Sequence, residues 1–281
     1  MTETVFTNNM AYAVACVGVS GIGSFYGTSP EQMKAVISDV HSNIEAFRAV
    51  LEDIESLAIK DILCLGDMVG YGPNPREAIA LTMKTCRQTI LGNHEMAIMG
   101  EQEDFNERAK AAVQWTKNQL AIRGKAAGVN KKLWDFLGRM KKIMVEGSFV
   151  FVHGSPRDYA REYIFPRDIY EEEKLGEIFS KFEHYCMIGH THIPGVITED
   201  LSFLQPQDFG NIYKLTSKKA IINTGSVGQP RDGDNRACYV VLHDDAVEYR
   251  RVPYDFQRTM EKIRATGVLP ETLAKRLAEG K

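Results

Sequence analysis

The chain has 281 residues, of which 44 % are hydrophobic, 25 % charged and 9 % aromatic, and its formal net charge is -3 at pH 7. These values are typical of a soluble globular protein and exclude a collagen-like, coiled-coil or disordered chain. So small a net charge provides no overall basic field that would draw the molecule to nucleic acid or anionic lipid, so any recognition of phosphate has to be local.

The five cysteines include no Cys-x-x-Cys pair, which favours neither a disulfide framework nor a cysteine zinc site and is typical of a reducing cytoplasm. The longest apolar stretch, residues 11–25, is too short to span a bilayer and lacks the basic start of a signal peptide. We therefore expect a cytoplasmic protein without a membrane partner.

Strands and helices are predicted to alternate along the first two thirds of the chain. Apolar, β-rich runs predict strands at residues 34–39, 61–65, 89–91, 149–152 and 185–188. The first helix is expected to begin in a capping box formed by Ser42 and Glu45, and the second at Asn74, which is followed by proline. A mostly helical stretch covers about residues 105–140, and a further helix lies near residues 171–180.

After about residue 194 the predicted strands follow one another, at residues 220–223, 238–242 and 247–252. Alternation predicts parallel β-α-β units in the first part, and consecutive strands predict antiparallel pairing in the second. The fold class is therefore α/β, a layered sandwich of two mixed β-sheets flanked by helices. We expect a single domain over residues 33–281 with a helical tail from about residue 256, and an N-terminal extension, residues 1–32, outside the fold.

Polar side chains follow a predicted strand at five places, where parallel strands would bring them to one sheet edge. The strings are ISDVH at 37–41, LGD at 65–67, LGNHE at 91–95, FVH at 151–153 and IGHTH at 188–192. A glycine precedes the polar residue in three of them, which allows a sharp turn and a close approach of the backbone to an ion.

The residue types in these strings are those of a metal site. Asp39 and His41 are two residues apart, as are His190 and His192, and on an extended segment this spacing points both side chains of a pair to one face. Imidazole with carboxylate oxygen suits Mn, Fe, Zn, Ni or Co better than Ca or Mg. About six or seven such ligands exceed those of one catalytic zinc and indicate two metals that share a carboxylate, for which Asp67 is the natural bridge.

In this order, D-x-H, G-D, G-N-H-E, a lone His and G-H-T-H resemble the five sequence blocks of the calcineurin-like metallophosphoesterase superfamily. Further strings at residues 66–75, 152–156 and 222–234 resemble its bacterial and archaeal phosphodiesterase-like branch. Glu95 stands where many relatives have Asp. Because that position is not a metal ligand in the family, we expect the difference to affect only the fit of the substrate.

The resemblance implies two divalent ions (Mn, Fe, Zn or Ni) and a role for each matching residue. The first ion would be held by Asp39, His41, Asp67 and His192, and the second by Asp67, Asn93, His153 and His190. His94 would be the general acid. In this scheme the two cations, about 3.5 to 4 Å apart, lower the pKa of a bridging water, the resulting metal-bridging hydroxide attacks phosphorus in line, and His94 protonates the leaving oxygen.

Two weaker features leave alternatives open. The basic residues between 117 and 142 would either steer a phosphate chain or, as we favour, form a solvated helix face; they are Lys117, Arg123, Lys125, Lys131, Lys132, Arg139, Lys141 and Lys142. The loop at residues 223–232 would either place Asn223, Ser226 or Arg231 against a substrate phosphate or serve as a structural turn. His184 and His243 match no motif, and we expect both to be structural or to face solvent.

We therefore expect a cytoplasmic, dinuclear metal-dependent phosphoesterase that hydrolyses phosphomonoesters or phosphodiesters, with manganese among its candidate metals. Its partner would be a phosphate-ester substrate, and nucleic acid enters only as a substrate. The alternatives are a protein or nucleotide phosphatase of narrow specificity and a non-catalytic scaffold of the same fold. Because every ligand position and His94 are filled, the enzyme is favoured. The motifs specify a phosphorus centre but neither the esterified group nor the oligomeric state.

Overall fold

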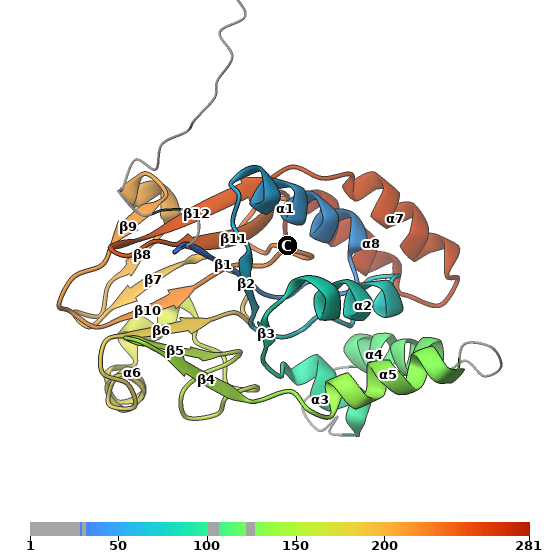
Figure 1. The fold of residues 1–281 in the computed structure, drawn as a ribbon, viewed down its shortest axis with the longest axis horizontal. Coiled ribbons are helices and arrows are strands. Elements are labelled where there is room, and N and C mark those ends of the chain that lie inside the picture. The colour runs from blue at the N-terminus through green and yellow to red at the C-terminus, as the bar shows by residue number, and fades with distance from the viewer. Residues whose placement is uncertain (1–28, 30–31, 101–106, 122–126) are drawn as a thin grey trace, which may run out of the picture.

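The computed structural model describes residues 29, 32–100, 107–121 and 127–281 (Figure 1). Two six-stranded sheets pack against each other, with helices beside them, which confirms the predicted layered α/β fold. Most of the predicted N-terminal extension, together with Arg123 and Lys125, lies outside the described residues.

The first sheet has the strand order β3-β2-β1-β11-β12-β9. Its strands are Gln88–Thr89 (β3), Asp61–Cys64 (β2), Lys34–Ile37 (β1), Ala237–Leu242 (β11), Ala246–Val252 (β12) and Ile212–Lys214 (β9). The strands β1, β2 and β3 are parallel, with Val36 opposite Leu63, whereas β11 is antiparallel to both β1 and β12. The predicted change from parallel to antiparallel pairing is thus found within this sheet.

The second sheet has the strand order β4-β5-β6-β10-β7-β8. Its strands are Ile143–Glu146 (β4), Phe149–Val152 (β5), Tyr185–Ile188 (β6), Ala220–Asn223 (β10), Gly195–Thr198 (β7) and Phe203–Leu204 (β8). The strands β5, β6 and β10 are parallel, so their carboxyl ends meet at one edge. The outer pairs are antiparallel.

The helices follow the predicted order along the chain. They are Ile44–Ser56 (α1), Pro75–Thr85 (α2), Asn93–Met99 (α3), Glu107–Leu120 (α4), Ala127–Leu137 (α5), Glu172–Phe179 (α6), Phe256–Ala265 (α7) and Glu271–Glu279 (α8), with 3-10 turns at Pro166–Tyr170 and Pro206–Phe209. The predicted helical stretch at residues 105–140 therefore contains the two helices α4 and α5. No helix in the described part of the chain is long and apolar enough to cross a membrane.

Alternation along the strands divides the hydrophobic core into layers. Ala35 and Ile37 of β1 pack against the helices of the first sheet, whereas Val36 between them faces the second sheet. In the second sheet Met187 faces inward and Ile188 packs with residues of α6. Because both faces of the central strands are buried, they read as continuous apolar runs in the sequence.

Two details differ from the sequence-based expectation. The strand β1 ends at Ile37 rather than at residue 39, because Asp39 has turned into the left-handed region with φ 55°. The N-cap of α1 is Asn43 and not Ser42, since the Asn43 side chain accepts a hydrogen bond from the backbone N–H of Ala46 at 3.1 Å. Ser42 itself has φ 56° and lies one residue before the cap.

The C-terminal helices pack on the body of the domain. The Thr259 hydroxyl of α7 donates a hydrogen bond to Asn43 Oδ1 at 2.9 Å, and Lys262 pairs with Glu45 at the start of α1. Residues of α7 and α8 form a buried cluster with Ala112 of α4, and Tyr71 packs against it. The loop that carries Tyr71 is therefore supported from the C-terminal side. The predicted domain bounds themselves stay a prediction.

Candidate dinuclear metal centre

The seven predicted metal ligands all follow strand ends of the two sheets. Asp39 and His41 follow β1, Asp67 follows β2, Asn93 begins α3 after β3, His153 follows β5, and His190 and His192 follow β6. Apart from Asn93, each of them is at most 3 % exposed. Loops from both sheets thus bring together charged and polar groups that are rarely buried without a partner.

Convergence of these side chains depends on turns and not on extended strands, contrary to the expectation from the two-residue spacing. Five of them have a left-handed backbone with φ between 48° and 66°: Asp39, His41, Asp67, His190 and His192. A residue with a Cβ atom is strained in this region by about 1 to 3 kcal/mol, and such strain concentrates at functional sites. The strands bring the backbone to the site, and the tight turns after them orient the predicted ligands.

Gly92 and Gly189 are needed because the loops that carry the predicted ligands contact each other at these two positions. A Cβ atom on Gly92 would lie 2.1 Å from Asp67 Oδ1, and one on Gly189 would lie 2.5 Å from Asp39 Oδ2. Neither distance leaves room for a side chain. The glycines predicted to let the backbone approach an ion thus let one ligand loop approach another.

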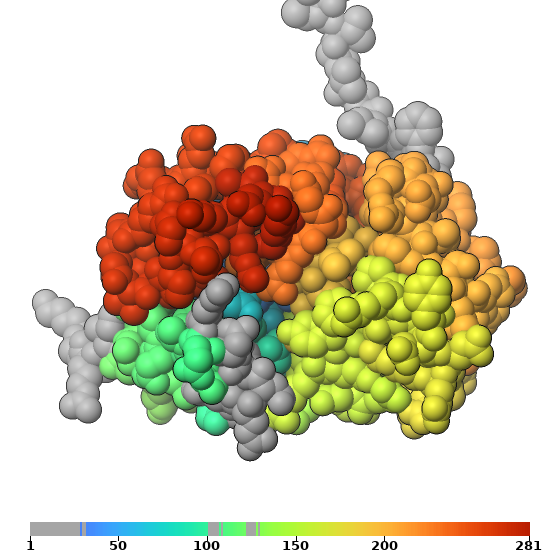
Figure 2. Space-filling view, turned by 180° about the vertical axis from the view of Figure 1, so that it is seen from behind, coloured from blue at the N-terminus to red at the C-terminus, as the bar shows by residue number. Residues whose placement is uncertain are grey.

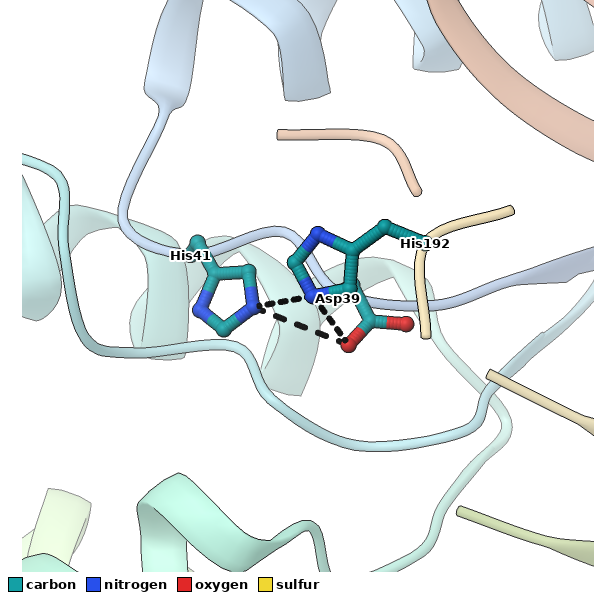
Figure 3. Close-up of side chains that lie close together, drawn as sticks. All are labelled: Asp39, His41 and His192. Atoms are coloured by element: carbon teal, nitrogen blue, oxygen red, sulfur yellow. Dashed lines mark hydrogen bonds and ion pairs between the residues drawn. The ribbon is translucent and has the colours of Figure 1, made fainter. Parts of the chain in front are cut away.

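Asp39, His41 and His192 form the first cluster (Figure 3). Asp39 Oδ1 lies 3.2 Å from His192 Nε2 and 3.6 Å from His41 Nε2. The two Nε2 atoms are themselves 3.0 Å apart. The other carboxylate oxygen of Asp39 accepts a hydrogen bond from the backbone N–H of His190 at 3.0 Å, which fixes Oδ1 toward the rings.

The second cluster surrounds Nε2 of His153. This atom lies 3.2 Å from Asp67 Oδ2, 3.1 Å from His190 Nδ1 and 3.2 Å from Asn93 Oδ1. Asp67 also borders the first cluster, because its Oδ2 atom is 3.7 Å from His41 Nε2. One carboxylate oxygen therefore faces both clusters, as the sequence predicted for a shared ligand.

Backbone carbonyls fix the orientation of all four ligand imidazoles. The ring nitrogens turned away from the clusters donate to Val69 O (His41, 3.0 Å), Gln229 O (His192, 2.6 Å), Leu65 O (His153, 2.8 Å) and Arg161 O (His190, 3.0 Å). A carbonyl can only accept, so each of these nitrogens carries a proton. In a ring that carries only this proton, the nitrogen that faces the cluster holds the lone pair, as in metal-binding histidines.

The donor set fits bound cations. Burial lowers the pKa of His190 to about 3 and that of His192 to about 4, so both rings are neutral near pH 7 and their lone pairs face other acceptors. Asp39 Oδ1 is buried and accepts no hydrogen bond from the described residues. Burial opposes the charge of His153, yet Asp67 and other acids raise its pKa to about 9. The acidic groups at the second cluster therefore favour a positive charge there.

His94 lies beside both clusters. Its backbone N–H donates to Asp67 Oδ1 at 2.9 Å, and its ring Nε2 is 4.0 Å from Asp67 Oδ2. Its ring meets those of His41 and Tyr71 with centroids 4.7 Å and 4.5 Å apart. Burial holds the pKa of His94 well below its ordinary value. His94, His41 and Asp67 also form a third group close enough to share an ion.

Glu95 joins the loops that carry the predicted ligands, and its expected effect on substrate fit stays a prediction. Its buried carboxylate accepts hydrogen bonds from the backbone N–H groups of Asp67 (2.8 Å), Gly92 (3.0 Å) and Val69 (3.2 Å). Burial and the charge of Asp67 raise its pKa to about 7. Residue 95 thus ties the loop after β2 to the start of α3.

The loop after β10 places its three candidate residues differently. The Asn223 amide donates to Gly189 O and Thr191 Oγ1, both at 2.8 Å, and the Ser226 hydroxyl donates to Asp39 O at 2.9 Å. These two side chains thus hold the ligand loops. The Arg231 guanidinium lies 5.8 Å from the centre of the Tyr71 ring, and its buried Nε has no hydrogen-bond partner among the described residues.

Residues 33–246 match the calcineurin-like phosphoesterase superfamily domain. The chain belongs to this superfamily. The resemblance of the five motifs to this superfamily is thereby confirmed. Membership of the superfamily implies a phosphate-ester substrate.

Three similar proteins each align with 89 % of this chain. The uncharacterized protein MJ0912 of Methanocaldococcus jannaschii is 38 % identical over 257 residues, which are 89 % of this chain and 99 % of that protein. A metallophosphoesterase from Sphaerobacter thermophilus has a crystal structure with a TM-score of 0.75 at 36 % identity, covering 89 % of this chain and 100 % of that one. The protein PH1004 of Pyrococcus horikoshii OT3 shares the fold, with a TM-score of 0.69, 20 % identity and coverage of 89 % and 98 %.

Two tyrosines at the calcineurin-like site were not predicted. The Tyr71 ring lies against His41, with centroids 4.6 Å apart, as well as against His94. The Tyr163 ring stacks on His190 with centroids 3.6 Å apart and an interplanar angle of 21°. Tyr71 stands within the GYG string after Asp67, which could have indicated it, whereas no motif contains Tyr163.

The remaining candidates lie at the surface or away from the two clusters. His184 is exposed, and His243 pairs with Glu248 at 3.1 Å, so the expectation for both is confirmed. Of the predicted basic face, Lys117 is half-buried, and the exposed members are Lys131, Lys132, Arg139, Lys141 and Lys142. This agrees with the favoured interpretation of a solvated surface.

Proposed function

We propose that the chain is a dinuclear metal-dependent phosphoesterase. The single observation that carries the proposal is the position of Asp67 Oδ2, which lies within 3.7 Å of His41 Nε2 and 3.2 Å of His153 Nε2. A carboxylate oxygen between two groups of imidazole lone pairs is the arrangement that a pair of cations requires. Membership of the superfamily supports the reaction class.

The proposed ligands divide between the two clusters. Asp39, His41, Asp67 and His192 would hold the first ion, and Asp67, Asn93, His153 and His190 the second. When bound, the two ions supply electrostatic stabilisation of the phosphoryl oxygens and activation of water. Asp67 and Asp39 contribute the negative charge that holds them, and the backbone carbonyls behind the imidazoles keep each lone pair in place.

His94 is the proposed general acid. Its backbone is tied to Asp67 by a 2.9 Å hydrogen bond, while its ring stays beside the clusters, where a leaving oxygen would lie. Because burial lowers the pKa of the ring, the negative charge of a bound phosphate is needed to favour its protonated form.

Arg231 is the proposed phosphate contact. Its guanidinium is half-buried near the first cluster, and its charge contributes to the lowered pKa of His192. A bidentate contact from Arg would position non-bridging oxygens in a way that the point charge of Lys does not. Arg231→Lys should then raise KM or lower kcat several fold without changing the metal content.

The experiment uses matched series of monoesters and diesters with alkyl, ribose and nitrophenyl leaving groups, supplied to metal-stripped protein reloaded with Mn, Ni, Zn or Mg. Wild type and His94→Asn are compared, with His184→Asn as a control on an exposed histidine. General acids contribute about 10² to 10⁴ fold. We expect His94→Asn to keep its metals and to lose most activity toward alkyl and ribose esters, but much less toward nitrophenyl esters. Equal losses across the series would refute the acid role, and no hydrolysis by reloaded wild type would refute the proposed function.

A further inference from the structure

Tyr163 is held rigidly against the second cluster. Its ring stacks on the His190 imidazole at 3.6 Å between centroids, and Phe165 stacks on it in turn at 5.1 Å with an interplanar angle of only 6°. The Arg167 guanidinium lies 5.2 Å from the Phe165 ring centre. The column of near-parallel planar groups thus fixes the plane of the tyrosine ring.

The hydroxyl of Tyr163 is nevertheless available. The side chain is 39 % exposed despite its ring contacts, and no hydrogen bond to its hydroxyl is found among the residues that the structure describes. The contact of its ring with His190 places Tyr163 beside the second cluster. A rigid donor without a protein partner at the edge of a charged site is suited to a ligand oxygen.

Tyr163 and Arg231 approach the site from different segments. Tyr163 belongs to the segment between β5 and α6, and its ring contacts His190 of the second cluster. Arg231 follows β10, and its backbone N–H donates a hydrogen bond to the backbone carbonyl of His192 of the first cluster at 3.2 Å. In Figure 2 the segment after β5 (yellow-green) and the C-terminal helices (red) stand on either side of a recess in which the loops after β2 and β3 (cyan to teal) lie deeper. Tyr163 thus contacts His190 of the second cluster, and Arg231 lies in the loop that is bonded to His192 of the first.

We propose that Tyr163 is a substrate-binding residue whose hydroxyl donates a hydrogen bond to an oxygen of the bound phosphate group at the second cluster, while Arg231 contacts the same group at the first. This inference rests on the proposed function. It assigns the ligand by chemistry, as a phosphate oxyanion that bridges the two clusters. The aromatic column keeps the hydroxyl in place before the ligand arrives, so little side-chain entropy is lost on binding.

The same stacking would also be explained if Tyr163 only oriented the His190 ring. Tyr163→Phe separates the two roles, because it keeps the ring and removes only the hydroxyl. Tyr170→Phe is the matched control, since Tyr170 ends the 3-10 turn of the same segment and is 83 % exposed. Both variants leave the buried core unchanged.

The dissociation constant of inorganic phosphate is measured by titration calorimetry on metal-loaded wild type, Tyr163→Phe and Tyr170→Phe, together with metal content and kcat/KM for one ester. A hydrogen bond to a charged group corresponds to about 10- to 100-fold in affinity. We expect Tyr163→Phe to weaken phosphate binding and to lower kcat/KM by about this factor with metal content unchanged, and Tyr170→Phe to match wild type.

A phosphate dissociation constant for Tyr163→Phe within two-fold of wild type, with both metals present, would overturn the inference. Failure of the proposed function is distinguishable, because wild type would then hydrolyse no ester with any metal. The phosphate titration does not depend on turnover, so it decides the role of Tyr163 in either case.

Discussion

His41 Nε2 and His192 Nε2 lie 3.0 Å apart, and each ring donates its other nitrogen's proton to a backbone carbonyl, that of Val69 or Gln229. When both rings carry only that proton, their lone pairs face each other, an arrangement that is repulsive without a positive charge between them. The two carbonyls belong to the loops after β2 and β10, so elements of both sheets impose this orientation of the rings. The fold thus stabilises a geometry whose favourable partner is a cation.

Loss of the Asp67 carboxylate should affect both ions. Asp67→Ala removes the oxygen that faces both clusters and would leave two bound cations to repel each other at short range, whereas His41→Ala removes a proposed ligand of the first cluster alone. We expect Asp67→Ala to lower the occupancy of both metals and His41→Ala to lower mainly one. Elemental analysis of the purified variants measures this. Two full equivalents of metal in Asp67→Ala would contradict the shared-ligand assignment.

Gly92→Ala should damage the site although glycine is no ligand. The new Cβ would lie 2.1 Å from Asp67 Oδ1, so the carboxylate has to move from its position between the clusters. We expect at least a ten-fold loss of metal affinity, in line with about 10- to 100-fold for changes behind metal ligands. The control is Gly176→Ala in α6, where a Cβ meets nothing within 4 Å and where alanine favours the helix. Equal metal affinity in the two variants would show that the loops move apart freely.

Glu95→Gln tests the carboxylate that joins the ligand loops. The variant places an amide N–H2 where one of the two acceptor oxygens stood, so at least one backbone N–H among those of Asp67, Gly92 and Val69 loses its buried acceptor. We expect the free energy of unfolding of metal-free protein to fall by about 1 to 3 kcal/mol. Denaturant titration measures it, with the exposed Glu183→Gln as control. An unchanged stability would show that these hydrogen bonds contribute little and would leave substrate fit as the expected role of this position.

Stability should depend on pH through Asp53, which joins α1 to the first sheet. Its carboxylate accepts hydrogen bonds from Arg250 at 2.7 Å and 3.0 Å and from the Tyr239 hydroxyl at 2.6 Å. Burial would raise the pKa of Asp53, but these partners outweigh it and lower the pKa from its ordinary value of 3.8. A depressed folded-state pKa contributes stability above the unfolded value and loses it as the pH falls through the folded one.

Asp53→Asn should therefore be less stable than wild type near pH 7, by about 1 to 2 kcal/mol. The difference should shrink as the pH falls below 3.8. Urea titrations of both proteins across this range measure it. A difference that stays constant down to the lowest pH would mean that the charge of Asp53 contributes nothing.

Motif order predicted the convergence of these side chains, because each of them lies a few residues after the end of a strand. Their role as metal ligands stays a prediction. The strings around Asp67 and His153 could be placed at strand ends from their apolar runs alone, and the parallel pairing of β1 with β2 and of β5 with β6 then brings their ends together. The fold class followed from the same alternation, since β-α-β units require parallel strands.

The contacts between loops could not be read from the sequence. The two-residue spacing of Asp39 and His41 suggested an extended segment, but both have left-handed backbones that only the surrounding loops impose. Glu95 bonds backbone groups up to 28 residues away, and Tyr163 reaches His190 through tertiary packing. Such contacts leave no local periodicity or composition signal, so they become visible only in three dimensions.

The number of divalent ions bound per chain tests the account most directly. Wild-type protein, stripped by chelation and then saturated with manganese or zinc, is freed of unbound metal and analysed for metal and protein content. The shared position of Asp67 between the His41 and His153 nitrogens predicts two ions per chain. One ion or none in folded protein at saturating metal would contradict the dinuclear centre.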